Sequence, residues 1–329
     1  MARAFNVYGI GNAMVDIQYR VTSGFLATAG IEKGVMTLIE GDRHHELLRR
    51  LGDDVLKRSS GGSAANTMIA VANLGGKAYY ACKVAKDAYG DFYLQDLAAA
   101  GVASNRFQGE GITGKCLVMI TDDADRTMNT FLGITGTFGP EQLEPDVIQE
   151  SDYLYIEGYL VASDKGFDAA VAAQAAARAG GTRVSLSLSD PSIVAAFGDR
   201  MRALVAGGVD LLFCNEAEAW AFTETGNEDD ACSALEELVG AYAVTYEAEG
   251  AVVWNGGERI RSPGFGVDAV DTNGAGDMFA GAYLFGMTHG LDAEQSAKLA
   301  NYASMRVVAQ YGPRLEASLK DETERILEM

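Results

Sequence analysis

The chain has 329 residues and a formal net charge of −20, from 46 acidic and 26 basic side chains. This acidity, without any basic cluster, argues against a nucleic-acid-binding protein. Hydrophobic residues make up 48% of the chain and only 5 residues are proline, which indicates a packed globular enzyme rather than a disordered chain. No apolar run reaches the length of a membrane span, and the N-terminus lacks the apolar core of a signal peptide.

The cysteines and histidines do not suggest a metal centre. The 4 cysteines stand far apart and form no C-x-x-C pair, so we expect buried free thiols in a reducing cytoplasm. His44 and His45 fall in a charged, helix-like stretch, where we expect both imidazoles to be solvated. These residues support neither a zinc site nor a serine-hydrolase triad.

The chain begins with a predicted buried strand over residues 5–10, and the sequence remains β-like to residue 22. Gly9 and Gly11 end the first strand and are compatible with a dinucleotide-binding loop. The third glycine of such a loop is absent, however, and no clear helix follows. A dehydrogenase is therefore a weak alternative.

The rest of the first half mixes strands and helices. Further strands are predicted over residues 34–39 and 77–84, and helices over residues 42–50, 64–74 and 89–100. Residues 115–121 and 126–132 flank the turn-like Asp122-Asp123-Ala124-Asp125, which is typical of a hairpin.

From residue 152 onward, strands and helices alternate. Strands are predicted over residues 153–156, 183–188, 209–213 and 243–246, and helices over residues 165–179, 193–205, from 216, and 229–239. Repeated β-α alternation predicts a mainly parallel sheet covered by helices. The β-rich segments at about 13–40 and 108–135 do not alternate in this way. We expect them to form a small separate sheet inserted in a single domain that spans residues 1–329.

The stretch Asp271-Thr272-Asn273-Gly274-Ala275-Gly276-Asp277-Met278-Phe279 reads as a turn that opens a helix, after the β-formers Val267 and Val270. Gly274 and Gly276 allow a ligand to approach the backbone. The free N–H groups of the first turn favour an anion. Asp277 lies in the same turn, and we expect those N–H groups to keep its carboxylate ionised.

An anion cradle beside a base is what phosphoryl transfer to a hydroxyl needs. Taken alone, the stretch is equally compatible with an ordinary glycine-bearing loop that carries an acidic residue. A second stretch, Ser60-Gly61-Gly62-Ser63-Ala64-Ala65-Asn66-Thr67, changes that balance. Together, in this order and at this separation, the two resemble the paired signatures of the PfkB (ribokinase-like) carbohydrate kinase family, closest to its adenosine kinase branch.

The resemblance covers nearly the whole chain and implies a three-layer ribokinase-like α/β fold. Its mainly parallel sheet would be flanked by helices, with a small β-sheet lid over the sugar site. It also implies ATP and Mg²⁺ as cofactors, with K⁺ as an optional monovalent cation near Asp271.

Site residues follow from the resemblance position by position. Asp277 matches the catalytic base, and Gly274, Ala275 and Gly276 match the anion hole. Arg126, on the expected lid, resembles an arginine that closes over the transferring phosphate, although a solvated hairpin arginine is an equal alternative. The positions that match acceptor contacts are Asn12, Asp16, Gly62, Ser63 and Asn66, with Met14 as an apolar wall for a purine.

The nucleotide end matches less well. Asn215 and Glu218 resemble an N-x-x-E element whose glutamate holds Mg²⁺ through water, and the alternative is simple helix capping by Asn215. Thr245 and Gly250 resemble the ends of a T-x-G-x-x-G nucleotide loop, but Glu247 replaces its first glycine. Asn301, on a late helix, would line the adenine side.

The sequence thus favours a cytoplasmic ATP- and Mg²⁺-dependent kinase that phosphorylates a ribose primary hydroxyl, with adenosine to AMP as the preferred reaction. A ribokinase-type sugar kinase is the first alternative. A non-catalytic ligand-binding protein on the same fold is the second. The expected partners are small molecules only, on a monomer or homodimer.

Overall fold

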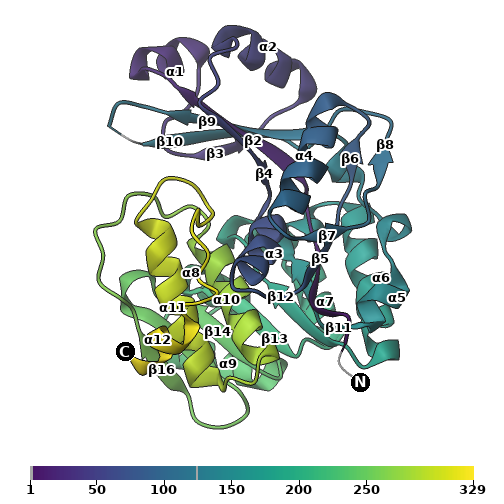
Figure 1. Ribbon diagram of the computed structural model, residues 1–329, viewed down its shortest axis with the longest axis vertical. Helices are drawn as coiled ribbons and strands as arrows, with labels where there is room; N and C mark the ends of the chain where they lie inside the picture. Colours follow the sequence, from purple (N-terminus) through teal and green to yellow (C-terminus); the bar gives the residue numbers. More distant parts are fainter. Residues whose placement is uncertain (1–2, 124) are drawn as a thin grey trace.

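The computed structural model describes residues 3–123 and 125–329. Within them the chain forms one large sheet with helices on both faces and a smaller sheet above one end (Figure 1). No helix among the described residues has the length and apolar character needed to span a bilayer. The predicted α/β fold with a mainly parallel sheet and a small second sheet is confirmed.

The large sheet is parallel in its centre and antiparallel at one edge. Its order is β16 (Ile260–Pro263), β15 (Gly250–Trp254), β14 (Tyr242–Thr245), β13 (Leu211–Asn215), β12 (Arg183–Ser187), β11 (Ser151–Glu157), β1 (Phe5–Ile10), β5 (Ala78–Ala81) and β7 (Ala103–Ser104). All neighbours from β14 to β7 pair in parallel, whereas β15 pairs antiparallel with both β14 and β16. The carboxyl ends of the central strands therefore meet at one edge of the sheet, where ligand sites of such folds lie.

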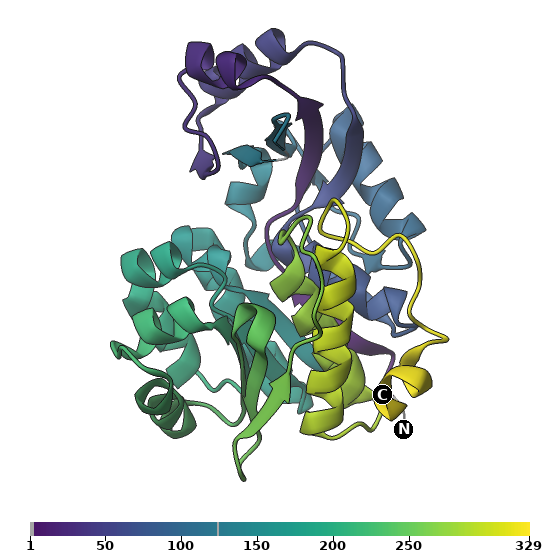
Figure 2. The same ribbon diagram turned by 90° about the vertical axis from the view of Figure 1, so that its left-hand side faces the viewer.

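Two apolar cores cover the two faces of this sheet. One contains α3 (Ser63–Asn73), α4 (Ala88–Ala99), α10 (Ala275–Thr288) and α11 (Ala293–Val308). The other contains α6 (Asp164–Gly180), α7 (Pro191–Ala206), α8 (Glu216–Thr223) and α9 (Glu228–Leu238). Figure 2 shows these two helical layers on opposite sides of the strands. The shorter helices are α5 (Pro145–Gln149), α12 (Thr323–Glu328) and the 3₁₀ turns η1 (Gly133–Thr137), η2 (Pro140–Gln142), η3 (Gly158–Ala162) and η4 (Glu247–Glu249).

The smaller sheet has the order β3 (Met36–Leu38), β10 (Arg126–Phe131), β9 (Gly114–Ile120), β2 (Met14–Arg20) and β4 (Lys57–Gly61). The predicted hairpin is confirmed, because β9 and β10 pair antiparallel; Ala124 in its turn lies outside the described residues. One face packs under α1 (Ser23–Ala29) and α2 (Gly41–Leu51), which bury Leu26 and Leu47 against it. The other face turns toward the large sheet and its helices (Figure 1).

Several predicted elements differ from the structure. The strand expected over residues 77–84 is two strands, β5 and β6 (Val84–Ala85), and β6 pairs with β8 (Gln108–Gly109) in a small ribbon. Val267 and Val270 form no strand. Both are exposed in the connection from β16 to α10, because β-propensity alone does not make a strand without a neighbour to pair with.

His44 also contradicts its prediction. It is only 1% exposed and stacks on Phe131 of β10, with 4.8 Å between the ring centroids. Neither of its ring nitrogens has a hydrogen-bond partner among the described residues. Burial is the main cause that lowers the pKa of His44 to about 4, and the nearby charge of Lys115 acts in the same direction. His45 is exposed, as expected.

We predict that His44→Phe leaves the fold intact and makes the protein more acid-resistant. The unfolded chain takes up a proton at His44 below about pH 6.5, while the folded chain does not until about pH 4. Wild-type stability should therefore fall relative to the variant as the pH drops through this window, by up to roughly 1.4 kcal/mol per pH unit. Urea unfolding at pH 7, 5.5 and 4.5 measures the difference in the free energy of unfolding between the variant and the wild type. His45→Phe is the control, and a constant difference between His44→Phe and wild type at all three pH values would contradict the prediction.

Candidate active site

The two signature stretches meet at the N-termini of α3 and α10. Asp277 lies in the first turn of α10 and Ser63 is the first residue of α3. The Ser63 hydroxyl donates to Asp277 Oδ1 over 2.6 Å, and Asn66 Nδ2 donates to Asp277 Oδ2 over 3.0 Å. Each oxygen of the Asp277 carboxylate is thus held by a donor from the neighbouring helix.

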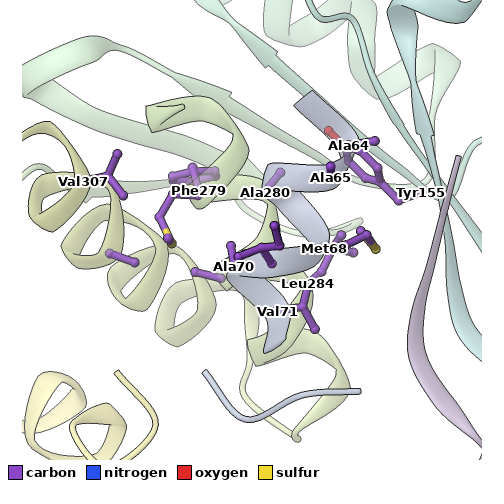
Figure 3. Close-up of a cluster of buried hydrophobic side chains, with 14 of the residues drawn as sticks. Ala64, Ala65, Met68, Ala70, Val71, Tyr155, Phe279, Ala280, Leu284 and Val307 are labelled. Atoms are coloured by element: carbon purple, nitrogen blue, oxygen red, sulfur yellow. The ribbon is translucent and has the colours of Figure 1, made fainter. Parts of the chain in front are cut away.

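Small residues let these two helices approach closely. A Cβ on Gly281 of α10 would come within 2.5 Å of Ala70 Cβ and 2.6 Å of the Thr67 carbonyl oxygen, both on α3. Figure 3 shows α3 and α10 side by side, and Ala70 of α3, whose Cβ faces Gly281, is one of the small residues of this contact. Only a residue without a side chain fits at position 281, and this spacing brings Asp277 within reach of α3.

The loop before α10 has the backbone that its glycines predict. Gly274 is the N-cap residue with φ of 79°, a left-handed conformation that glycine adopts without strain. A Cβ at this position would also overlap Pro313. Gly276 is exposed, and no atom lies within 4 Å of where its Cβ would be. The N-terminus of α10 therefore opens onto free space in which an anion can approach the first-turn N–H groups.

The expected state of Asp277 needs a correction. Its hydrogen-bond partners are the side chains of Ser63 and Asn66, not N–H groups of its own turn. Burial raises the pKa of Asp277 above its ordinary value, and the two hydrogen bonds and the charge of Arg314 oppose that rise. The carboxylate is therefore more basic than an exposed aspartate.

Glu157, at the end of β11, is a buried site residue that the sequence patterns missed. Its Oε1 accepts from the backbone N–H (3.2 Å) and Nδ2 (3.1 Å) of Asn12, and its Oε2 accepts from the N–H of Ala64 over 2.8 Å. It therefore ties the loop after β1 to the start of α3. Burial raises its pKa to about 7, against the pull of these three donors. An acidic residue ending an apolar strand was the signal available in the sequence.

Gly11, directly after β1, and Gly62, directly before α3, both have a structural explanation. A Cβ on Gly11 would overlap Glu157 Oε2, and a Cβ on Gly62 would overlap the Asn12 carbonyl oxygen. Gly62 also has φ of 102°, outside the range of most other residues. These glycines make room for the contacts around Glu157, and the absent third glycine agrees with a loop that is not of the dinucleotide-binding type.

Asp16 extends from β2 of the smaller sheet toward the same place. A Cβ on Gly61 would overlap its carboxylate. Burial raises the pKa of Asp16 to about 7; the charge of Asp277 adds to the rise, and the charges of Arg314 and Arg126 oppose it. Two carboxylates far apart in the sequence are therefore electrostatic neighbours. Met14, two residues earlier on β2, is half-buried beside Gly114.

Arg126 reaches from β10 to the loop before α10 and is not a solvated hairpin arginine. Its Nη1 lies 2.6 Å from Asp271 Oδ2, and the two side chains are only 10% and 5% exposed. Among the described residues, Arg126 Nε and Nη2 have no hydrogen-bond partner. Asp271 also accepts from the N–H groups of Asn273 (3.2 Å) and Gly312 (2.7 Å). A guanidinium and two N–H donors thus contact this carboxylate, and K⁺ near Asp271 stays a prediction.

Asn215 and Glu218 form the capping arrangement that was the alternative. Asn215 Oδ1 accepts from the N–H of Glu218 over 2.8 Å, while Glu218 Oε2 accepts from the N–H of Asn215 over 3.0 Å. Burial raises the pKa of Glu218 to about 7, with added repulsion from Asp190 and Asp277. Glu218 is therefore near the site even though it caps α8. No group of three or more His, Cys, Asp or Glu side chains in residues 3–123 and 125–329 is arranged to hold a metal directly.

The nucleotide-loop residues follow β14. Thr245 is its last residue, and Glu247, two residues later, has φ of 47°, a conformation that favours glycine. The Glu247 side chain is exposed, so its carboxylate can point to solvent. Gly250 begins β15 with φ of 98°. Asn301 Nδ2 donates to the carbonyl oxygens of Ser262 (3.0 Å) and Pro263 (3.2 Å), so it ties α11 to β16.

Arg314 is a second site residue that the sequence patterns missed. It lies in the irregular segment after α11. Its Nε donates to Asn66 Oδ1 over 3.2 Å, its Nη1 to Asp96 Oδ2 over 3.0 Å and its Nη2 to the Ser60 hydroxyl over 3.0 Å. No helical or strand periodicity marks this segment, so only a basic residue in a glycine- and proline-containing loop was visible.

The geometry of the site agrees with comparisons to known proteins. Residues 53–319 match the model of the pfkB family of carbohydrate kinases. The crystal structure of an adenosine kinase from Sinorhizobium meliloti is 39% identical and superimposes with a TM-score of 0.89, covering 98% of this chain and 99% of its own. A probable sugar kinase from Rhizobium etli CFN 42 is 36% identical with a TM-score of 0.90, covering 99% of both chains. The adenosine kinase of Saccharomyces cerevisiae is 28% identical over 92% of this chain and 95% of its own length.

The fold and the site define a ribokinase-like phosphotransferase that uses an alcohol group as acceptor. The match spans well over half of the chain, and the protein belongs to the pfkB family of carbohydrate kinases.

Proposed function

We propose that this protein is an ATP- and Mg²⁺-dependent kinase that phosphorylates the 5′-hydroxyl of adenosine to give AMP. The observation that carries the proposal is the Asp277 carboxylate, held by α3 donors beside the open N-terminus of α10. A base and an anion site are thereby adjacent. The relatives named adenosine kinase, at 39% and 28% identity, support this acceptor.

In the proposed reaction, Asp277 accepts the proton of the acceptor hydroxyl while the oxygen of that hydroxyl attacks the γ-phosphorus of ATP. The bond from the γ-phosphorus to the bridging oxygen breaks, and ADP leaves with that oxygen. Such transition states are loose, so orientation of the base matters more than its strength. The Ser63 and Asn66 donors fix the plane of the carboxylate.

Charge on the transferring phosphoryl group would be stabilised from two sides. The N–H groups of Gly274 and Gly276 would face it from the start of α10, while the Ala275 N–H donates to the Thr272 carbonyl oxygen over 3.2 Å. Arg126 would face it from the smaller sheet, since its Nε and Nη2 lack partners in the described structure. We infer that the smaller sheet is a lid that orders when both ligands bind.

Mg²⁺, when bound with ATP, supplies charge neutralisation on the phosphates. Glu218 would hold it through water, because both of its oxygens already accept from Asn215. A cation nearby would offset the repulsion from Asp190 and Asp277, which adds to the effect of burial on the pKa of Glu218. Thr245, Gly250 and Asn301 remain the residues predicted to bind the nucleotide.

The strand register of the smaller sheet favours a nucleoside over a free sugar. Asp16 pairs with Cys116, Cys116 with Thr130, and Thr130 with Leu38, and directly paired residues share one face of a sheet. Met14, Met36 and Met128 lie two residues from members of this row and share its face. Leu38 and Met36 are 58% and 43% exposed there.

Apolar side chains on the same sheet face as the proposed ribose-binding carboxylate suit a purine, because burying apolar area stabilises a complex by about 25 cal/mol per Å². A free sugar would leave this surface exposed. A ribokinase-type sugar kinase is the second candidate, supported by the similar probable sugar kinase of Rhizobium etli. A reducing cytoplasm remains the predicted compartment, consistent with cysteines that are all buried and unpaired.

We predict that Asp277→Asn lowers kcat for adenosine by about 10²–10⁴-fold, the usual effect of a general base, with nucleotide binding retained. Coupled ADP release across adenosine, other nucleosides, ribose and fructose measures the wild-type preference and the loss. Glu294→Gln, in the exposed first turn of α11, is the matched control. Near-normal turnover of Asp277→Asn would refute its role as base.

The lid proposal predicts slower amide exchange in β2 and β10 when adenosine and an unreactive ATP analogue are bound together. Closure protects these strands because Arg126 and Asp16 then contact bound groups. Helix α6, which packs on the face of the large sheet opposite α3 and α10, serves as an internal control that should not change. Equal exchange of β2 and β10 with and without ligands would rule out a mobile lid.

Asp16 should discriminate ribose from deoxyribose. A clamp on the 2′- and 3′-hydroxyls gives each carboxylate oxygen one donor, and loss of one donor costs about 1–3 kcal/mol. We therefore expect 2′-deoxyadenosine to show a kcat/KM roughly 5–150-fold below that of adenosine. In Asp16→Ala the two substrates should be similarly poor. Equal kcat/KM for both substrates in the wild type would refute the clamp.

A further inference from the structure

Arg314 connects the C-terminal segment to the base of the proposed reaction through one side chain. Its guanidinium contacts Ser60 at the end of β4, Asp96 on α4 and Asn66 on α3. Its side chain is only 16% exposed. The three contacts use a nitrogen each, so the orientation of the guanidinium plane is fixed.

This arrangement determines which way the Asn66 amide faces. A guanidinium nitrogen can only donate, so the atom of Asn66 opposite Arg314 Nε must be the oxygen. The amide nitrogen then faces Asp277 Oδ2, 3.0 Å away. Without Arg314, the amide could rotate and place its oxygen against the carboxylate, where two acceptors would repel each other.

Carboxylates crowd around Asp277 from several elements. The charge of Asp277 raises the pKa of Asp16 on β2, of Glu157 on β11 and of Glu218 on α8. Arg314 is the cation whose charge opposes the raised pKa of Asp277 itself. Arg126 acts on Asp16 and is paired with Asp271.

We propose that Arg314 is a positioning residue for phosphoryl transfer: it fixes the Asn66 amide, and through it the orientation of the Asp277 carboxylate. The effect on turnover rests on the kinase function proposed above. A different role would be purely structural, with Arg314 only anchoring the C-terminal segment to Asp96 and Ser60. The two roles differ in what happens to Asp277 when Arg314 is replaced.

Two substitutions separate the charge of Arg314 from its hydrogen bonds. Arg314→Gln removes the charge and the forked contacts, and should lower kcat by about 10–100-fold with little change in KM for the acceptor. It should also move the acid limb of the kcat/KM profile to higher pH, since loss of a nearby cation makes Asp277 harder to ionise. Arg314→Lys keeps the charge, so it should lower kcat while leaving the acid limb in place. If Arg314→Gln does not fold, the kcat of Arg314→Lys still tests the proposal.

Arg306→Gln is the matched control. Arg306 also carries a charge in the C-terminal region, but it pairs with Glu322 and Tyr302, away from Asp277. We expect wild-type kcat and pH profile from this variant. Unchanged kcat and an unchanged acid limb in both Arg314 variants, with only a lower melting temperature, would overturn the proposal in favour of a structural anchor.

A double-mutant cycle tests whether Arg314 acts through Asn66. In an Asn66→Ala background, Arg314→Lys should cause little further loss of kcat, because the amide that it orients is gone. Full additivity of the two losses would contradict the proposed connection.

The coupling can also be observed without turnover. The ¹³Cγ signal of Asp277, assigned by its absence from Asp277→Asn, should titrate at higher pH in Arg314→Gln than in wild type and in Arg306→Gln. If it does, but no alcohol is phosphorylated, the kinase proposal fails while the link between Arg314 and Asp277 stands. If the wild type phosphorylates an alcohol but Arg314→Gln changes neither the Asp277 signal nor kcat, the proposed link between Arg314 and Asp277 fails while the kinase proposal stands.

Discussion

The close packing of α3 against α10 is the constraint on which the site depends. Each helix supplies its N-terminus to the same point, and Gly281 against Ala70 sets how near the two axes come. A larger residue at this contact would separate the helices and move Ser63 and Asn66 away from Asp277. The apolar core and the polar site are therefore parts of one arrangement, because the spacing of the first determines the hydrogen bonds of the second (Figure 3).

The carboxylates that meet at these two helix N-termini share raised pKa values. Asp16, Glu157 and Glu218 all have pKa values raised to about 7 by burial, and Asp277 is raised as well. Such a concentration of carboxylates is stable only with donors. Asn12 and α3 supply them to Glu157, Asn215 supplies them to Glu218, and Ser63 and Asn66 supply them to Asp277. Carboxylates repel nucleotide phosphates, and the N–H groups at the start of α10 together with a bound Mg²⁺ would offset this repulsion. Arg126 adds the positive charge from the smaller sheet.

Much of the fold and part of the candidate site could be predicted from the sequence, because the patterns that indicate them are local. Alternating strands and helices, the hairpin and the two glycine stretches each depend on neighbouring residues, and the structure contains them. Glu157 and Arg314 could not be found in this way, because their roles come from residues more than 90 positions away. His44 had a local signal that was misjudged: it lies on one helical face with Leu47, Leu48 and Leu51, and that apolar face is the buried one.

A crystal structure with adenosine and an unreactive ATP analogue bound together would test the central claim most directly. The account predicts that the 5′-hydroxyl lies within about 3.2 Å of an Asp277 oxygen. It also predicts that the γ-phosphate faces the N-terminus of α10 and that the ribose 2′- and 3′-hydroxyls contact Asp16. An acceptor bound elsewhere, or a γ-phosphate away from the Gly274-Ala275-Gly276 turn, would contradict it.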